Sequence, residues 1–172
     1  MNILVLNGSP HLDGNTMYMV KAFQAGAEAV GHHVEVAHVA HMTIHGCLGC
    51  DHCKCTTPPV CAQKDDMQAL VPKMIQADML VLASPVYYFT LSAQLQSVIQ
   101  RTYVFDIPAQ ISKAALLLSS GSPGVYDAAI SQYQQALIEY WQITDTGIFT
   151  AAGADNRSQH TWDTLYQFGR SL

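Results

Sequence analysis

Three residues with hydrogen-bonding side chains, Ser9, Asn15 and Thr16, lie in a short loop between an apolar run and a helical pattern. The apolar run, residues 2–7, is typical of a fully buried strand. Free N–H groups and the positive end of a helix dipole favour a bound anion at such a strand-to-helix turn. The loop therefore predicts a phosphate site. An ordinary turn with helix-capping residues is the alternative.

The two glycines of this loop, Gly8 and Gly14, help to determine which class of phosphate ligand the loop could bind. They do not form the Gly-x-Gly-x-x-Gly pattern of dinucleotide sites, and position 15 is Asn where a P-loop has its lysine. The loop contains neither lysine nor arginine, so it must hold an anion by hydrogen bonds. A terminal monophosphate suits such a loop best.

Two further loops carry residues that suit a planar ligand. The first begins at Ser84 and Pro85 and groups the aromatic residues Tyr87, Tyr88 and Phe89. Its backbone N–H groups could bond the edge of a heterocycle while the aromatic rings cover its faces. Packing under the next helix, or a dimer contact, is the alternative. The other loop, residues 119–124, is rich in small residues that allow close backbone approach, unless it is a plain turn.

A dense group of cysteines is the second distinctive feature. Five lie within fifteen residues: Cys47, Cys50, Cys53, Cys55 and Cys61. Close Cys-x-x-Cys spacing is typical of [4Fe–4S] ligands. Zinc is a second reading, with His45 and His52 as nitrogen donors. Free thiols or a redox pair are a third, because cysteines also pack as small apolar residues.

The elements that must position these residues alternate along the chain. Strands are expected at residues 2–7, 33–39, 79–84, 114–119 and 143–150. Helices are expected after the first strand, after an Asp65 or Asp66 cap, near 92–102, across 130–140 and around 162–166, with Pro72 kinking or shortening the second. This alternation predicts an α/β fold of three layers, a doubly wound five-stranded parallel sheet of flavodoxin-like order 2-1-3-4-5. Ligands bind such sheets at the carboxyl ends of the strands, where the three loops lie.

Composition limits the partners and the location. The 172 residues suit a single domain, residues 1–172, with 49% hydrophobic and 12% charged residues. A net charge of −5 with few arginines argues against nucleic acid, and no run is long enough to span a membrane. A core strand at the N-terminus leaves no signal peptide, so we expect a cytoplasmic protein with reduced cysteines. The low charge content indicates that a second subunit covers part of the surface.

These motifs together resemble the flavodoxin-fold NAD(P)H-dependent FMN reductases, a family that includes quinone reductases and iron–sulfur flavoproteins. The resemblance is carried by Gly8-Ser9-Pro10, Gly14-Asn15-Thr16, Ser84-Pro85-Val86-Tyr87, Gln94-Leu95, Arg101 and Asp65-Asp66-Met67. It implies FMN, with its phosphate on the first loop and its isoalloxazine against the second. The residues expected to bind FMN are Ser9, His11, Gly14, Asn15, Thr16, Ser84, Pro85, Val86, Tyr87, Tyr88, Ser119 and Gly121. His11 stands where the family often has a basic residue.

The resemblance also sets the expected function. It implies an oxidoreductase that passes electrons from NADH or NADPH through FMN to a small acceptor, such as a quinone, a nitro or azo compound, or a flavin. Catalysis then rests on the flavin, with no catalytic side chain, in a homodimer or higher homo-oligomer. One alternative is an electron-transfer iron–sulfur flavoprotein whose [4Fe–4S] cluster is held by Cys47, Cys50, Cys53 and Cys61. A flavodoxin-type carrier is a second, and a module that has lost its cofactor is a third.

Overall fold

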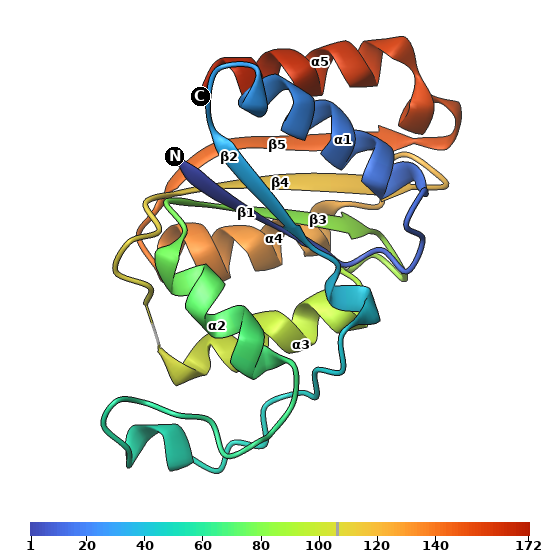
Figure 1. Ribbon diagram of the computed structural model, residues 1–172. Helices are drawn as coiled ribbons and strands as arrows, with labels where there is room; N and C mark the ends of the chain where they lie inside the picture. Colours follow the sequence, from blue (N-terminus) through green and yellow to red (C-terminus); the bar gives the residue numbers. More distant parts are fainter. Residues whose placement is uncertain (106) are drawn as a thin grey trace.

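The computed structural model describes residues 1–105 and 107–172, and its centre is a parallel sheet (Figure 1). The strands are β1 (Asn2–Asn7), β2 (His33–Ala37), β3 (Met79–Pro85), β4 (Lys113–Ser120) and β5 (Thr144–Ala152). Their order is β2-β1-β3-β4-β5, and every neighbouring pair is parallel. The predicted fold class and strand order are therefore confirmed.

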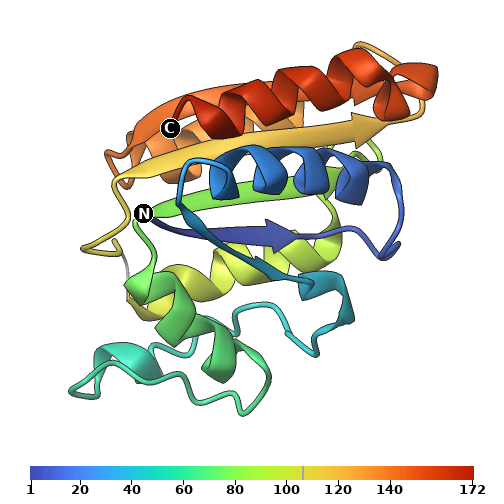
Figure 2. The ribbon, with the colours of Figure 1, turned by 45° about the horizontal axis from the view of Figure 1, so that its top comes forward.

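Helices cover both faces of the sheet, as its two apolar faces require. In Figures 1 and 2, α1 (Asn15–Glu28) and α5 (Gln159–Arg170) lie on one face. On the other lie α2 (Met67–Gln76), α3 (Ala93–Arg101) and α4 (Asp127–Tyr133). Both views place the three carboxyl-edge loops at one end of the molecule. No helix in the described ranges is long and apolar enough to span a membrane.

Apolar residues of the strands form a core on each side of the sheet. Alternate residues of one strand face opposite sides, so Leu4 and Leu6 of β1 join the core under α2 and α3. Ile3 and Val5 join the core under α1 and α5 instead. The strand β3 is buried along its whole length. This two-sided burial explains why the strands appear as continuous apolar runs in the sequence.

Two backbones approach closely where α1 crosses α5. A Cβ added at Gly26 would lie 2.0 Å from the carbonyl oxygen of Tyr166. A Cβ added at Gly169 would lie 2.3 Å from the carbonyl oxygen of Phe23. Glycine at both positions therefore allows the two helices to pack backbone against backbone.

The second helix differs from its expected form at Pro72. The helix α2 continues through this proline to Gln76, so the expected shortening does not occur. At its start, the Asp65 carboxylate accepts the Met67 N–H at 3.2 Å, as expected of a capping aspartate. Asp66 occupies the N-cap position without a side-chain cap bond within the described ranges, and its carboxylate accepts the Thr43 N–H at 2.7 Å instead.

The helix after β4 changes type partway. After Tyr133 it becomes a π-helix, η4 (Gln134–Glu139), in which the Tyr140 N–H bonds the Gln135 carbonyl. Sequence spacing places Tyr140 on the buried face with Tyr133, but Tyr140 is 60% exposed and Trp141 only 6% exposed. The wider π turn explains this shift, because its bonds span five residues rather than four.

Candidate functional site

A cavity of about 170 Å³ lies where the loops after β1, β3 and β4 meet. Its lining residues are Ser9, His11, Asn15, Thr16, Pro85, Val86, Tyr87, Ser119, Ser120 and Gly121. Of the residues predicted to bind FMN, all but Gly14, Ser84 and Tyr88 line it. The fold thus brings together residues that are more than a hundred positions apart in the chain.

The first loop is shaped by Asn7, a residue that sequence reasoning did not single out. Asn7 is buried at the end of β1, and its side-chain oxygen accepts the Ser9 N–H at 3.0 Å. The Ser9 hydroxyl in turn accepts the His11 N–H at 3.2 Å. Gly8 is needed here, because a Cβ at this position would lie 2.4 Å from Ser92 Oγ. These contacts fix the path of the loop around the cavity.

A neutral histidine supports Asn7 from the end of β2. The Asn7 amide nitrogen lies 3.3 Å from His38 Nδ1. Burial lowers the pKa of His38, and the nearby His41 lowers it further. At neutral pH the His38 ring is therefore uncharged, and its Nδ1 can accept the hydrogen bond from Asn7. Sequence reasoning did not single out His38, because a part-buried hydrogen bond between residues at the ends of two strands leaves no mark in residue spacing.

The start of α1 is open to an acceptor. Gly14 is the N-cap residue, and within the described part of the chain no side chain caps the helix. The first turn also lacks an acidic residue. The free N–H groups and the helix dipole therefore present partial positive charge beside the cavity. Two buried hydroxyls flank this turn, with Thr16 Oγ1 2.7 Å from Ser119 Oγ.

The second loop forms a tight turn that displays aromatic rings. Tyr87 and Thr90 exchange backbone hydrogen bonds of 3.2 and 3.1 Å. Between them, Tyr88 and Phe89 have positive φ angles of 48° and 68°. Tyr88 is 97% exposed, so its side chain points into solvent and not into the cavity. Residues other than glycine rarely adopt this left-handed backbone conformation, and those that do are found most often at functional sites.

Ser84 does not line the cavity. It is fully buried, and its hydroxyl accepts the Ser92 N–H at 2.9 Å and donates to the Pro85 carbonyl at 2.7 Å. Ser92 in turn caps α3 through the Leu95 N–H. The structure therefore places Ser84 where it fastens β3 to the start of α3.

The third loop is tied to the end of β5. The Ser120 hydroxyl lies 2.7 Å from the Tyr126 hydroxyl, which donates to the Ala151 carbonyl at 3.0 Å. The buried Asn156 donates to the Ser120 carbonyl at 2.8 Å. Asn156 belongs to the short helix η5 (Gly153–Arg157), which follows β5. This network holds Ser120, a lining residue that sequence reasoning missed, against the C-terminal part of the chain.

An arginine from η5 reaches the first loop. Arg157 Nε donates to the Asn15 side-chain oxygen at 3.2 Å, and its Nη2 donates to the Asp13 carbonyl. The Asp13 carboxylate, by contrast, pairs with Lys21 at 3.1 Å. Arg157 lies 142 positions after Asn15, so no local pattern could have indicated this contact.

The cysteines are not among the residues that line the cavity, and they belong to a segment that extends beyond α2 (Figure 1). We call residues 47–61 the cysteine segment. Cys53 is buried and Cys61 half-buried, whereas Cys47, Cys50 and Cys55 are exposed. Burial raises the pKa of the Cys53 thiol. Such a buried thiol is chemically inert.

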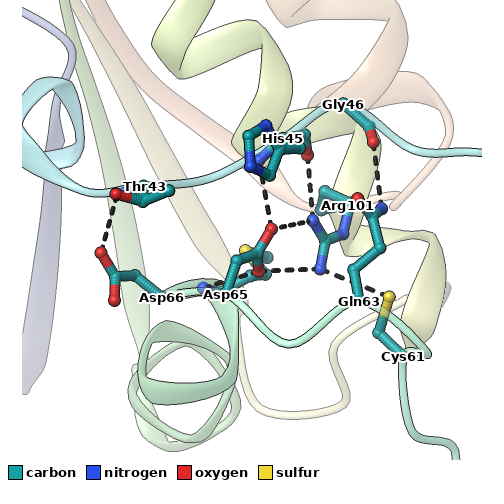
Figure 3. Close-up of polar contacts among 9 residues, drawn as sticks. Thr43, His45, Gly46, Cys61, Gln63, Asp65, Asp66 and Arg101 are labelled. Carbon is teal, nitrogen blue, oxygen red and sulfur yellow. Dashed lines mark hydrogen bonds and ion pairs between the residues drawn. The ribbon is translucent and has the colours of Figure 1, made fainter.

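The two ends of the cysteine segment are fastened by one buried ion pair, shown in Figure 3. Arg101 of α3 donates to both carboxylate oxygens of Asp65, at 2.6 and 3.0 Å. The same guanidinium donates to the His45 carbonyl at 2.9 Å and to Cys61 Sγ at 3.3 Å. Gln63 adds a hydrogen bond of 3.0 Å to the Gly46 carbonyl. Arg101 thus joins the residues before the segment to those after it.

The thiols do not form a metal site as they are arranged. Across residues 1–105 and 107–172, no three His, Cys, Asp or Glu side chains are placed to hold one ion. Thiolates are chemically suited to iron or zinc. In this arrangement, however, Cys47, Cys50, Cys53 and Cys61 do not fit a cluster, nor do His45 and His52 complete a zinc site.

Fold and cavity together define an open α/β protein with a polar cavity at the carboxyl edge of its sheet. The sequence model for NADPH-dependent FMN reductases matches residues 1–153. The chain therefore belongs to that family, and the resemblance seen in the sequence is confirmed.

Iron–sulfur flavoproteins are among its relatives. One from Methanocaldococcus jannaschii is 32% identical over 136 residues, which cover 77% of this chain and 69% of that protein. Two from Archaeoglobus fulgidus are 31% and 36% identical over 102 and 101 residues, each 59% of this chain. These alignments cover 49% and 45% of the two relatives, so the chain spans about half their length.

Solved structures show the same fold. An NAD(P)H:quinone oxidoreductase from Methanothermobacter marburgensis superposes with a TM-score of 0.76 at 18% identity, covering 100% of this chain and 96% of that one. An azoreductase from Bacillus anthracis superposes with a TM-score of 0.72 at 13% identity, covering both chains completely. At these identities the likeness concerns the fold.

Proposed function

We propose that this protein is an FMN-dependent oxidoreductase that oxidises NADH or NADPH and reduces a small acceptor. The main support is the cavity at the carboxyl edge, where hydroxyl and amide donors from two loops meet the uncapped start of α1. Membership of the FMN reductase family supports the cofactor and the donor. The names of the structural neighbours favour quinones and azo compounds as acceptors.

The donor set fits a phosphate. Ser9, Asn15 and Thr16 line the cavity and offer neutral donors, and the first turn of α1 has no carboxylate that would repel an anion. Among the described residues, no side chain accepts a hydrogen bond from the first N–H groups of α1, and a bound phosphate would be their acceptor. Ser119 supports Thr16 from β4, since the two hydroxyls are 2.7 Å apart.

The cavity suits one end of the cofactor. Its volume of about 170 Å³ is below the range of roughly 300–1,000 Å³ usual for whole ligand sites. The flavin ring would therefore extend to the surface, where Tyr87 and Phe89 are exposed. Bound FMN supplies the hydride chemistry, and the protein binds it, orients it and excludes water.

The visible absorption spectrum of the anaerobically purified chain, before and after addition of NADPH, tests this proposal. We expect two flavin bands that bleach on addition. A colourless protein that also fails to take up added FMN would contradict the proposal. A flavin that bleaches only with a protein partner would indicate a flavodoxin-type carrier instead.

Variants of the first loop test the phosphate assignment. Asn15→Ala and Thr16→Val should each weaken FMN binding about tenfold, because a hydrogen bond to a charged group contributes about 1.5 kcal/mol. Thr164→Val is a matched control, since Thr164 is an exposed residue of α5. Unchanged FMN affinity in both loop variants would contradict the assignment of the FMN phosphate to this loop.

A second candidate is an electron-transfer iron–sulfur flavoprotein. It is favoured by the cysteine spacing and by the relatives that carry this name. Iron and acid-labile sulfide, measured on the same anaerobic sample, distinguish the two candidates. About four of each per chain would support a [4Fe–4S] cluster on Cys47, Cys50, Cys53 and Cys61. Zinc in place of iron would support a zinc site. Thiols without any bound metal would support the interpretation that the cysteines are free or form a redox pair.

A further inference from the structure

The first loop lacks lysine and arginine, yet a guanidinium lies beside it in the fold. Arg157 reaches the loop from η5 and contacts both Asn15 and the Asp13 carbonyl. The helices η5 and α1 are in contact, and Figure 1 shows the start of α1 and the chain that follows β5 at the carboxyl end of the strands. Arg157 also follows the last residue matched by the family model, residue 153.

The contact between Arg157 and Asn15 determines which end of the Asn15 amide, the oxygen or the NH₂ group, is free to bind a phosphate. An asparagine side chain carries one acceptor oxygen and one donor NH₂ group. A phosphate attracts the donor and repels the oxygen. The Arg157 Nε–H can bond only an acceptor, so at 3.2 Å it takes the Asn15 oxygen. The NH₂ group of Asn15, a lining residue of the cavity, is then left for another acceptor.

The same guanidinium takes a second oxygen at this turn. Its Nη2 donates to the Asp13 carbonyl, an oxygen that would otherwise oppose an anion. The Asp13 carboxylate is held by Lys21. Arginine stays charged at all relevant pH values, so Arg157 also adds a fixed positive charge beside the start of α1.

We propose that Arg157 is a positioning residue for the phosphate of FMN: by holding the Asn15 oxygen and the Asp13 carbonyl, it turns the donors of the first loop toward the anion. This inference rests on the proposed function. It differs from a direct phosphate contact, because Arg157 does not line the cavity and acts through Asn15.

Binding of FMN and of riboflavin, which has no phosphate, tests this role. Both dissociation constants are measured by quenching of flavin fluorescence on the full chain after its own flavin is removed. Arg157→Gln should weaken FMN binding about tenfold and change riboflavin binding by less than about twofold. Arg170→Gln, the same change at an exposed arginine near the end of α5, should leave both constants unchanged.

A double mutant tests whether Arg157 acts through Asn15. In an Asn15→Ala background, Arg157→Gln should weaken FMN binding clearly less than in the wild-type background, because one of the two groups that Arg157 holds is gone. Equal weakening in both backgrounds would overturn the positioning role. Full FMN affinity in Arg157→Lys would overturn it too, since charge alone would then suffice. If Arg157→Gln fails to fold, which circular dichroism reports, Arg157→Lys and its double mutant decide.

The outcomes separate this inference from the proposed function. A wild-type chain that binds no flavin, or binds FMN no better than riboflavin, removes the phosphate site and the inference with it. A wild-type chain that prefers FMN, with Arg157→Gln keeping the same preference, overturns the inference and leaves the proposed function intact.

Discussion

At the residue scale, the Arg101 guanidinium fixes the geometry around the cysteine segment. Arg101 is 2% exposed, and the Asp65 side chain that it binds through two nitrogens is 4% exposed. Burying two charges is costly, and attraction repays the cost only when the geometry is good and further hydrogen bonds are made. Here the His45 carbonyl and Cys61 Sγ provide those further bonds. Loss of one partner would leave the other charge buried and unpaired.

Asp65→Asn should lower the free energy of unfolding by about 3 kcal/mol at pH 7. Burial raises the pKa of Asp65, but hydrogen bonds from Arg101 and the His45 N–H outweigh it and leave the pKa below its usual value. The carboxylate therefore stabilises the fold above about pH 4, and this contribution is lost as the pH falls through the lowered pKa. Urea unfolding at several pH values should show the difference between wild type and variant narrowing below about pH 4.

Asp66→Asn is the matched control for that experiment. Its carboxylate accepts the Thr43 N–H at an exposed position, so this variant should lose about 1 kcal/mol or less. A wild-type-to-Asp65→Asn difference that stays constant from pH 7 to pH 3 would show that the ion pair does not carry the stability.

Tyr88→Gly should raise the free energy of unfolding by roughly 0.5–1 kcal/mol. Relief of a left-handed conformation is worth roughly 1–2 kcal/mol, and the extra freedom of glycine in the unfolded chain costs roughly 0.5–1 kcal/mol. Within one chain the exposed ring of Tyr88 has little packing to lose, so the urea titration is run at a concentration at which the chain is monomeric. Tyr87→Gly, at a position without a positive φ, should give no gain in the same urea titration. Destabilisation by Tyr88→Gly would show that the ring makes contacts that its exposure hides.

At the element scale, the contact between α1 and α5 depends on the absence of two side chains. Gly26→Ala adds a methyl group that would lie 2.0 Å from the Tyr166 carbonyl oxygen. In an isolated helix this change would gain about 1 kcal/mol. Overpacking by one methyl group typically costs about 1–3 kcal/mol, and here the obstacle is backbone that cannot rotate away.

We therefore expect Gly26→Ala to lower the free energy of unfolding by about 2 kcal/mol. Thermal or urea unfolding measures this directly. Ala25→Gly, the neighbouring change in the opposite direction, should cost about 1 kcal/mol through helix propensity alone. A stabilised Gly26→Ala variant would mean that the two helices separate without cost.

Elements with strong apolar patterns were predictable from the sequence, and those that depend on local geometry were not. The run at Met79 and the helical spacing at Leu70 and Met74 indicated β3 and α2 correctly, because both faces of the sheet select apolar residues. The π turn before Tyr140 left no compositional signal. Pro72 did leave a signal, but it predicted a kinked or shortened helix, and residue types alone do not show that α2 continues through it to Gln76.

At the scale of the whole molecule, the cavity was predictable because topology alone brings the loops together. Parallel strands place the loops after β1, β3 and β4 at one edge, so Ser9, Thr16 and Ser119 could be grouped from strand assignments. Arg157 and Asn7 could not, because their roles rest on particular side-chain bonds. The exposed position of Tyr88 depends on backbone angles that no residue pattern specifies.

We expect the chain to form a homodimer. Only 12% of its residues are charged, and three exposed aromatic residues adjoin the cavity: Tyr87, Tyr88 and Phe89. Light scattering after gel filtration should give twice the chain mass at micromolar concentration. The double variant Tyr88→Ser and Phe89→Ser should weaken the dimer at least tenfold, since buried aromatic residues dominate interface energy. A monomeric mass for the wild type would contradict the expectation.

The fastening of the cysteine segment by Arg101 has a consequence for how such chains diverge. The residues before and after the segment are joined directly to each other, by Arg101 with Asp65 and His45 and by Gln63 with Gly46. Closing a flexible loop twice as long costs only about 0.6 kcal/mol more. Insertions, deletions and changes of cysteine number between these fixed ends therefore impose little thermodynamic burden on the sheet. The cysteine segment can therefore change in length and in cysteine number while the flavodoxin-like fold that carries it stays the same.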